Sequence, residues 1–285
     1  PGKVVTAALQ RTDFPTANEA LLAPFLQDTN NDNAGLINFV RGKDRDWKLG
    51  DINHSTPVVV GPPNGVESLL GSGYSNFVTT YKDRTKVVYV GANDGMLHCF
   101  NVTTGAELWG FIPYNLLPKL QKQWGVDKVN GDRYYSHDNF VDGSPSVSDV
   151  YINGQWRTVL ICGQGPGKGS TMAGGYNYYF ALDVTDPADP QPLWEISPLN
   201  ASDQYTMGET WSIPVIGKIN DAGTTRWVAF MGSGYDNVGQ KVAGRTFYVV
   251  RIDTGAAIWT TTVTDVDTSL FVSPRVPYAD PKSVV

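Results

Sequence analysis

The residues best suited to bind a metal ion lie near the N-terminus, in residues 28–35. Oxygen donors at the first, third, fifth and seventh positions of a loop are how proteins wrap a calcium ion. The candidate ligands are Asp28, Asn30, Asp32 and the backbone carbonyl of Ala34. The later carboxylates of such loops are missing, since the ninth position is Leu36 and the twelfth is Phe39. The segment therefore predicts a weak calcium site, and the alternative is a turn rich in Asn and Asp.

A glycine-rich segment, residues 163–170, is the second candidate for ligand chemistry. A phosphate-binding loop needs a Gly-Lys-Ser/Thr triplet that opens a helix, so that backbone amides point at the phosphates. Here Gly169 separates Lys168 from Ser170, and the residues from Tyr176 onward are typical of a strand. We therefore expect a connection between strands, and no nucleotide.

The histidines and cysteines show no spacing typical of a zinc site or a catalytic centre. His54, His98 and His137 form no paired motif, and no Gly-x-Ser-x-Gly or Cys–His pattern marks a nucleophile. Cys99 and Cys162 fall in apolar strand-like runs, so we expect buried free thiols. The alternative is a disulfide that joins them, which an extracellular location would favour. The sequence thus predicts a protein that is not an enzyme.

Composition and charge indicate an all-β protein. Thirty Gly and 18 Pro accompany only 18% charged residues, which favours strands joined by tight turns over long helices. The net charge of −6 argues against a nucleic-acid surface, which normally presents clustered Lys and Arg. No run of 18 apolar residues occurs, so the sequence predicts that the chain does not span a membrane.

Three segments of the chain repeat one order of features. Each opens with a proline shortly after a serine, namely Pro57, Pro145 and Pro214. Each continues into an apolar strand that ends at glycine, predicted at 87–91, 158–163 and 227–232. Each closes on a turn followed by a tryptophan, namely Trp109, Trp194 and Trp259. Proline costs no ladder bond at the start of a strand, and we expect each tryptophan to be buried between neighbouring repeats.

This repetition predicts a modified β-propeller, because small twisted sheets bury their apolar faces by stacking around an axis. We expect blades at about 51–113, 140–197 and 208–262, and a fourth that begins near 273, within a partial propeller at 51–285. Residues 1–50 are expected to form an N-terminal leader, with a helix from Ala17 to Phe25 capped by Asn18. A β-sandwich with coincidental tryptophan spacing is the alternative.

Two groups of aromatic residues lie in connections longer than a hairpin needs. The first comprises Tyr74, Phe77 and Tyr81, and the second lies between Trp124 and Tyr135. Long loops on a rigid scaffold often carry binding sites. Packing of these side chains over the rim of the propeller is the alternative.

Residues 36–42, 49–57 and 88–98, followed by Phe-Ile-Pro at 111–113, resemble the C-terminal domain of the PilC/PilY family. The resemblance implies a modified propeller with quinoprotein-like blades that serves type IV pilus assembly, pilus extension and retraction under calcium control, and adhesion. It also implies an extracellular or outer-membrane location at the pilus tip. The implied partners are pilins or minor pilins, the remainder of a longer chain, and a host or surface receptor.

Two other functions compete with that expectation. The segment 92–109, with Ala-Asn-Asp-Gly, Thr-Thr-Gly and Trp, is also similar to blades of quinoprotein dehydrogenases. Those enzymes use a complete ring, calcium beside a quinone and often adjacent cysteines, whereas three repeats and separated cysteines predict no quinone here. The third candidate is an outer-membrane assembly scaffold unrelated to pili.

Overall fold

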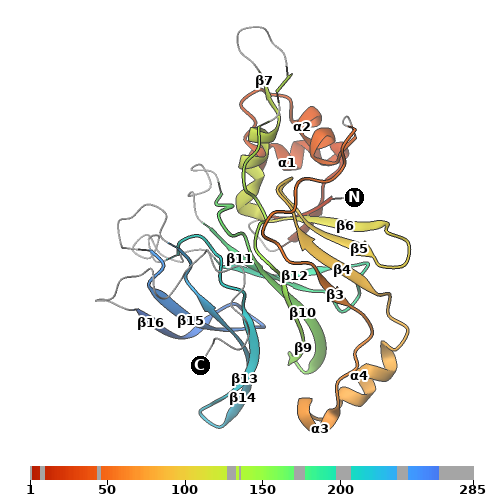
Figure 1. Ribbon diagram of the computed structural model, residues 1–285, viewed down its shortest axis with the longest axis vertical. Helices are drawn as coiled ribbons and strands as arrows, with labels where there is room; N and C mark the ends of the chain where they lie inside the picture. Colours follow the sequence, from red (N-terminus) through yellow and green to blue (C-terminus); the bar gives the residue numbers. More distant parts are fainter. Residues whose placement is uncertain are drawn as a thin grey trace.

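Three β-sheets lie side by side as the blades of a fan in the computed structural model (Figure 1). The structure describes residues 2–6, 10–43, 46–126, 133–134, 136–169, 177–196, 207–235 and 243–262. Each sheet contains four consecutive antiparallel strands, and the innermost strands of the three sheets are neighbours. The predicted all-β propeller architecture is confirmed.

Blade 1 is a four-stranded sheet that two further strands extend. Its strands are β3 (Val58–Val60), β4 (Val87–Gly91), β5 (Leu97–Asn101) and β6 (Glu107–Ile112). The added hairpin consists of β1 (Gly2–Thr6) and β2 (Gln10–Asp13), and β1 pairs in parallel with the outer strand β6. The sequence did not predict this added hairpin, because β1 joins the sheet by pairing with β6, which is distant from it in the chain.

Blades 2 and 3 keep the simple order of four strands. Blade 2 contains β9 (Ser146–Ile152), β10 (Gln155–Gly163), β11 (Tyr179–Asp183) and β12 (Gln191–Ile196). Blade 3 contains β13 (Val215–Asp221), β14 (Thr224–Gly232), β15 (Thr246–Arg251) and β16 (Ala257–Thr262). The three strands predicted from apolar runs are β4 and parts of β10 and β14, each the second strand of its blade. Pro57, Pro145 and Pro214 directly precede the first strands, as predicted.

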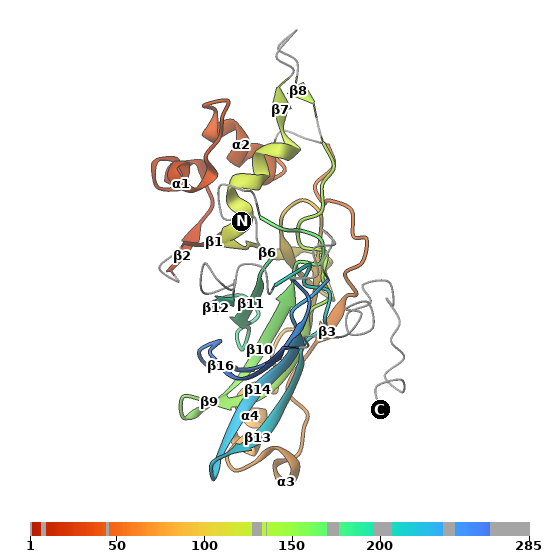
Figure 2. The ribbon, with the colours of Figure 1, turned by 90° about the vertical axis from the view of Figure 1, so that its left-hand side faces the viewer.

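Helices of the N-terminal segment pack at one end of the fan (Figures 1 and 2). They are η1 (Thr16–Asn18), α1 (Glu19–Leu26) and α2 (Asn33–Val40). Helices α1 and α2 contact η2 (Tyr114–Gln123), which precedes the short pair β7 (Gly125–Val126) and β8 (Arg133–Tyr134). The predicted helix is present as α1, but the side-chain amide of Asn18 donates to the Asp13 carbonyl and does not cap the helix. The predicted start of a fourth blade lies outside the described residues.

Two short helices between β3 and β4 lie at the opposite end of the molecule (Figures 1 and 2). These are α3 (Glu67–Leu70) and α4 (Tyr74–Thr80). Tyr74 and Phe77 are buried against Trp156 of blade 2, and Tyr81 packs on Phe77. The first predicted aromatic group therefore packs against the propeller. No described helix is long and apolar enough to cross a bilayer.

Tryptophans on the outer strands join successive blades. The Trp109 indole on β6 donates to the Pro187 carbonyl in the β11–β12 turn of blade 2, at 2.8 Å. The Trp194 indole on β12 donates to the Ile252 carbonyl in the β15–β16 turn of blade 3, also at 2.8 Å. Both rings are buried, so each tryptophan combines a large apolar contact with one directed hydrogen bond. The prediction for these two residues is confirmed.

The corresponding prediction for Trp259 is wrong. Its side chain on β16 is 52% exposed, and its ring contacts the half-exposed Phe247 of the neighbouring strand. Trp259 occupies the position in blade 3 that Trp109 and Trp194 occupy in blades 1 and 2. It is exposed because no further sheet lies against it among the described residues.

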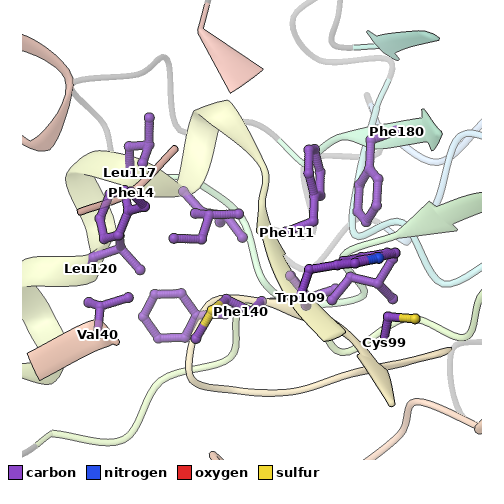
Figure 3. Packing of buried hydrophobic residues seen from close by; sticks show 14 of the residues in the cluster. Phe14, Val40, Cys99, Trp109, Phe111, Leu117, Leu120, Phe140 and Phe180 are labelled. Atoms are coloured by element: carbon purple, nitrogen blue, oxygen red, sulfur yellow. The ribbon is translucent and has the colours of Figure 1, made fainter. Parts of the chain in front are cut away.

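The main core runs from the N-terminal helices through blade 1 into blade 2. Phe111 and Phe180 lie across the junction of the two blades with ring centroids 5.2 Å apart, and Trp109 lies over Cys99 (Figure 3). Phe14 and Val40 of the N-terminal segment belong to the same cluster (Figure 3). The N-terminal segment and blades 1 and 2 therefore share one core.

We predict that the three tryptophans contribute unequally to stability. Trp109→Ala and Trp194→Ala should each lower the free energy of unfolding by about 3–5 kcal/mol, the usual cost of removing a large buried aromatic side chain. Trp259→Ala is the matched control and should cost less than about 1 kcal/mol, because its ring is exposed. Urea denaturation of the three variants measures these differences. Equal losses at all three positions would contradict the inferred docking.

Candidate functional site

The loop between β4 and β5 connects three separate segments to blade 1. The amide of Asn93 donates to the Asp51 carbonyl at 2.9 Å, and the Asn93 side-chain oxygen accepts the amide of Phe140 at 3.0 Å. Asp94 is buried, and its carboxylate accepts the amide of Gly50 at 2.8 Å. Gly95 has φ 104°, and a side chain there would collide with Leu120 of η2. These contacts explain the Asn-Asp-Gly motif as a structural junction.

His98 lies between two carboxylates beside this loop. Its Nε2 is 3.0 Å from Asp94 Oδ1, and its Nδ1 is 2.6 Å from Glu107 Oε1. Burial of the ring by itself lowers the pKa of His98, but the charges and hydrogen bonds of Asp94 and Glu107 outweigh burial and raise the pKa to about 9. His98 is therefore an imidazolium at neutral pH, and both of its N–H groups donate to carboxylates.

A carboxylate stands before the first strand of each blade, and an aromatic ring nitrogen contacts each one. Asp142 is 2.6 Å from His54 Nδ1, and Asp51 is 3.0 Å from His137 Nε2. In blade 3 the indole of Trp211 donates to the Glu209 carboxylate at 2.7 Å. The sequence analysis missed these pairs. The available signal was an acidic residue two to four positions before the opening serine of every repeat.

The opening serines also have a defined role. The hydroxyl of Ser55 accepts the amide of Gly91, and that of Ser212 accepts the amide of Gly232. Each of these glycines ends the second strand of the same blade. In blade 2 the hydroxyl of Ser144 instead accepts the amide of Thr56, which joins blade 2 to blade 1. The serine before each proline thus satisfies a backbone donor that the sheets leave unpaired.

The predicted calcium ligands lie in the turn that connects α1 to α2. The Asp28 carboxylate accepts the amides of Asn30 at 3.1 Å and Asp32 at 2.8 Å. The Asp32 carboxylate accepts the amide of Gly35 at 3.0 Å and caps α2. These are the bonds of an Asx turn and a helix cap, which agrees with the alternative interpretation. Two carboxylates are the only anionic donors of the segment, so its chemistry fits weak calcium binding at most, and the calcium site stays a prediction.

The glycine-rich segment packs closely against the backbone of other segments. A side chain at Gly167 would lie 1.7 Å from the Phe140 carbonyl oxygen, and one at Gly169 would lie 2.6 Å from that of Asn115. Gln164 is buried and exchanges two amide hydrogen bonds with Asn115, at 2.9 and 2.7 Å. Close backbone approach therefore accounts for these glycines.

Both cysteines are free thiols within the core. Burial raises the pKa of Cys99 to about 12 and raises that of Cys162 as well. A thiol needs its thiolate form to act as a nucleophile or a metal ligand, so both are chemically inert at neutral pH. Across the described residues, no three His, Cys, Asp or Glu side chains come together in a way that could hold a metal ion.

The stacked four-stranded sheets, their tryptophan contacts and the loop junctions define a β-propeller module. A family model described as the PilY1 beta-propeller domain matches residues 49–280, so the chain belongs to the PilY1 β-propeller family. The crystal structure of the Pseudomonas aeruginosa PilY1 C-terminal domain is similar, with a TM-score of 0.52 and 32% sequence identity over 73% of this chain and 37% of that one.

Curated relatives carry the same family name. The type IV pilus biogenesis factor PilY1 of Pseudomonas aeruginosa (strain UCBPP-PA14) is 38% identical over 222 residues, which are 74% of this chain and 18% of that protein. A PilY1 homolog of Xylella fastidiosa is 34% identical over 265 residues, or 81% of this chain and 20% of that protein. The chain thus spans about a fifth of the length of these relatives.

The calcium hypothesis predicts a melting temperature that depends on calcium. A ligand that binds only the folded state raises the midpoint of unfolding, and a site with few carboxylates should bind at about 10⁻⁴–10⁻³ M. The rise should disappear in Asp28→Ala and Asp32→Ala, and persist in the exposed control Asp83→Ala. Thermal melts with calcium and with chelator measure it. A rise that survives both substitutions, or none in the unmodified chain, would leave the segment as a turn and a helix cap.

The imidazolium of His98 should make stability depend on pH. Its pKa is raised from the ordinary 6.5 to about 9, so its contribution is complete below pH 6.5 and is lost as pH rises toward 9. We expect the free energy of unfolding to fall over this interval more steeply in the unmodified chain than in His98→Phe. Val102→Ala, in the turn between β5 and β6, removes an exposed side chain that does not titrate, so it serves as the control and should keep the original slope. Equal slopes in the chain and in His98→Phe would contradict the assignment.

Proposed function

We propose that this chain is a protein-binding module of a type IV pilus biogenesis factor and works on the outer surface of the cell or at the pilus tip. The observation that carries the proposal is the family match over residues 49–280, the same region in which the three blades lie. The relatives that share this region are named type IV pilus biogenesis factors.

The chemistry of the described residues favours binding over catalysis. The buried His98 uses both ring nitrogens in hydrogen bonds to carboxylates, and both thiols are buried with raised pKa values. A propeller is a rigid support, and its long connections are the natural places for recognition. Here these connections are the segment with α3 and α4 and the segment with η2. We therefore propose that the module is not an enzyme and holds no quinone.

The proposed partners are pilins or minor pilins, further parts of the same longer protein, and a surface receptor used in adhesion. Calcium bound in the turn between α1 and α2 would modulate extension and retraction by stabilising the N-terminal helices against η2. The charge of −6 disfavours nucleic acid as a partner.

A chimera tests the proposal. Residues 49–280 of this chain would replace the matching segment of Pseudomonas aeruginosa PilY1, and surface pili would be counted in a strain that lacks the native gene. We expect the chimera to restore pili and to co-purify with pilins or minor pilins. The Trp109→Ala chimera should do neither, because its junction between blades 1 and 2 is disrupted. The Trp259→Ala chimera is the control, because it removes an exposed ring and should leave the fold intact.

The result against the proposal is a chimera that is exported and folded but neither restores pili nor co-purifies with pilins. Recovery with outer-membrane proteins alone would then favour a scaffold unrelated to pili. Quinone absorbance in the purified protein would favour a dehydrogenase.

A further inference from the structure

A small cavity of about 80 Å³ lies between the N-terminal segment and blade 1. The N-terminal segment contributes Phe14, Val40, Arg41 and Lys48, and blade 1 contributes Met96, His98, Glu107 and Gly110. A space of this size holds several water-sized groups, so a small head group fits and a nucleotide or a sugar does not.

The residues that blade 1 contributes to the cavity do not recur at the equivalent positions of blades 2 and 3. His98 pairs with Gly110 across β5 and β6, on the face opposite to Cys99 and Trp109 and therefore away from blade 2. The positions of His98, Glu107 and Gly110 are occupied by Phe180, Pro192 and Glu195 in blade 2, and by Tyr248, Ala257 and Thr260 in blade 3. Among the three blades, only blade 1 has a cationic histidine, a glutamate and a glycine at these three positions.

Gly110 creates part of the space. A Cβ atom at this position would lie 2.7 Å from Met96 Sδ and 3.5 Å from Glu107 Oε1. The φ angle of Gly110 lies outside the left-handed region, so the backbone does not demand glycine here. Because Gly110 has no side chain, the space beside Met96 and Glu107 stays open.

The lining carries more positive than negative charge, although the whole chain is acidic. Arg41, Lys48 and the His98 imidazolium face one carboxylate, that of Glu107, and Asp94 behind His98 supplies a second. Lys48 donates to the Gly42 carbonyl, and the two N–H groups of His98 are engaged. Within the described part of the chain, the Arg41 guanidinium has no hydrogen bond or ion pair, so its donors remain available.

We propose that this cavity binds a carboxylate carried on a short apolar stem. The planar Arg41 guanidinium offers two parallel N–H groups that match a carboxylate. Phe14, Val40 and Met96 provide an apolar wall for the stem. Two sources share this chemistry, a free short-chain carboxylic acid and the C-terminal carboxylate of an extended peptide. The proposal goes beyond the pilus function and does not depend on it.

Methionine methyl groups provide a direct probe, because the cavity contains Met96 and no other methionine. The chain carrying [¹³C]methyl-methionine would be titrated with acetate, butyrate and inorganic phosphate, and with one short peptide as its C-terminal acid and as its amide. We expect saturable movement of the Met96 signal with butyrate, less with acetate and none with phosphate. Met207 and Met231, which lie in the core of blades 2 and 3, should not move.

The peptide arm distinguishes the two sources. Stronger binding of the peptide acid than of butyrate, with no binding of the amide, indicates a peptide terminus. Binding of butyrate alone indicates a free acid. Either result supports a carboxylate site.

Three variants test the assignment. Arg41→Gln should weaken binding by about tenfold or more, since a hydrogen bond to a charged group is lost. Gly110→Ala should abolish it by filling the cavity, and thermal melts check that each variant is folded. Lys43→Gln is the matched control, because it removes an exposed cation from the same segment that does not line the cavity.

Three outcomes would overturn the proposal. The first is a Met96 signal that does not move saturably with butyrate, up to the concentration at which added salt alone shifts the signals of Met207 and Met231. The second is equal binding of phosphate and butyrate, which would mean non-selective anion attraction. The third is unchanged affinity in a folded Arg41→Gln or Gly110→Ala variant.

Discussion

The structure depends on the hydrogen bond from an outer-strand tryptophan to a turn carbonyl of the following blade. A four-stranded sheet has two apolar faces and cannot remove both from water by itself. The Trp109–Pro187 and Trp194–Ile252 bonds fix how neighbouring sheets meet, since the indole N–H must find its acceptor while the ring is buried. In the turn that receives Trp194, Gly255 has φ 70°, a conformation that favours glycine, and a Cβ there would also lie 2.8 Å from the ring.

Among the described residues, blade 1 makes contacts with the rest of the chain that the other two blades do not repeat. The Asn93-Asp94-Gly95 loop binds the segments at Gly50, Asp51 and Phe140, and the β1–β2 hairpin widens the sheet. Through these contacts the N-terminal helices share a core with blades 1 and 2. Buried charges at His98 and Asp94 are tolerated there because each has partners of opposite charge.

The features predicted from sequence are those that short-range chemistry determines. Apolar runs that end at glycine located β4, β10 and β14, and the proline shortly after a serine located the start of each blade. The β1–β6 pairing joins residues far apart in the chain, so spacing could not reveal it. The recurring acidic residue before each opening serine was visible in the sequence, but the distant ring partners of Asp142 and Asp51 were not. Trp259 shows the same limit, because the repeat defines its position on β16 but a neighbouring sheet decides its burial.

The tryptophan contacts have a direction. In both junctions the earlier blade supplies the indole and the later blade supplies the acceptor carbonyl, so the stacking runs head to tail along the chain. A blade that has just formed therefore exposes its own tryptophan until the third and fourth strands of the next one exist. In a chain that emerges N-terminus first, the blades therefore assemble in chain order. The hairpin of the third and fourth strands of each new blade covers the tryptophan of the blade before it. The unsatisfied indole always belongs to the most recently completed blade, which limits exposed apolar surface to the growing end.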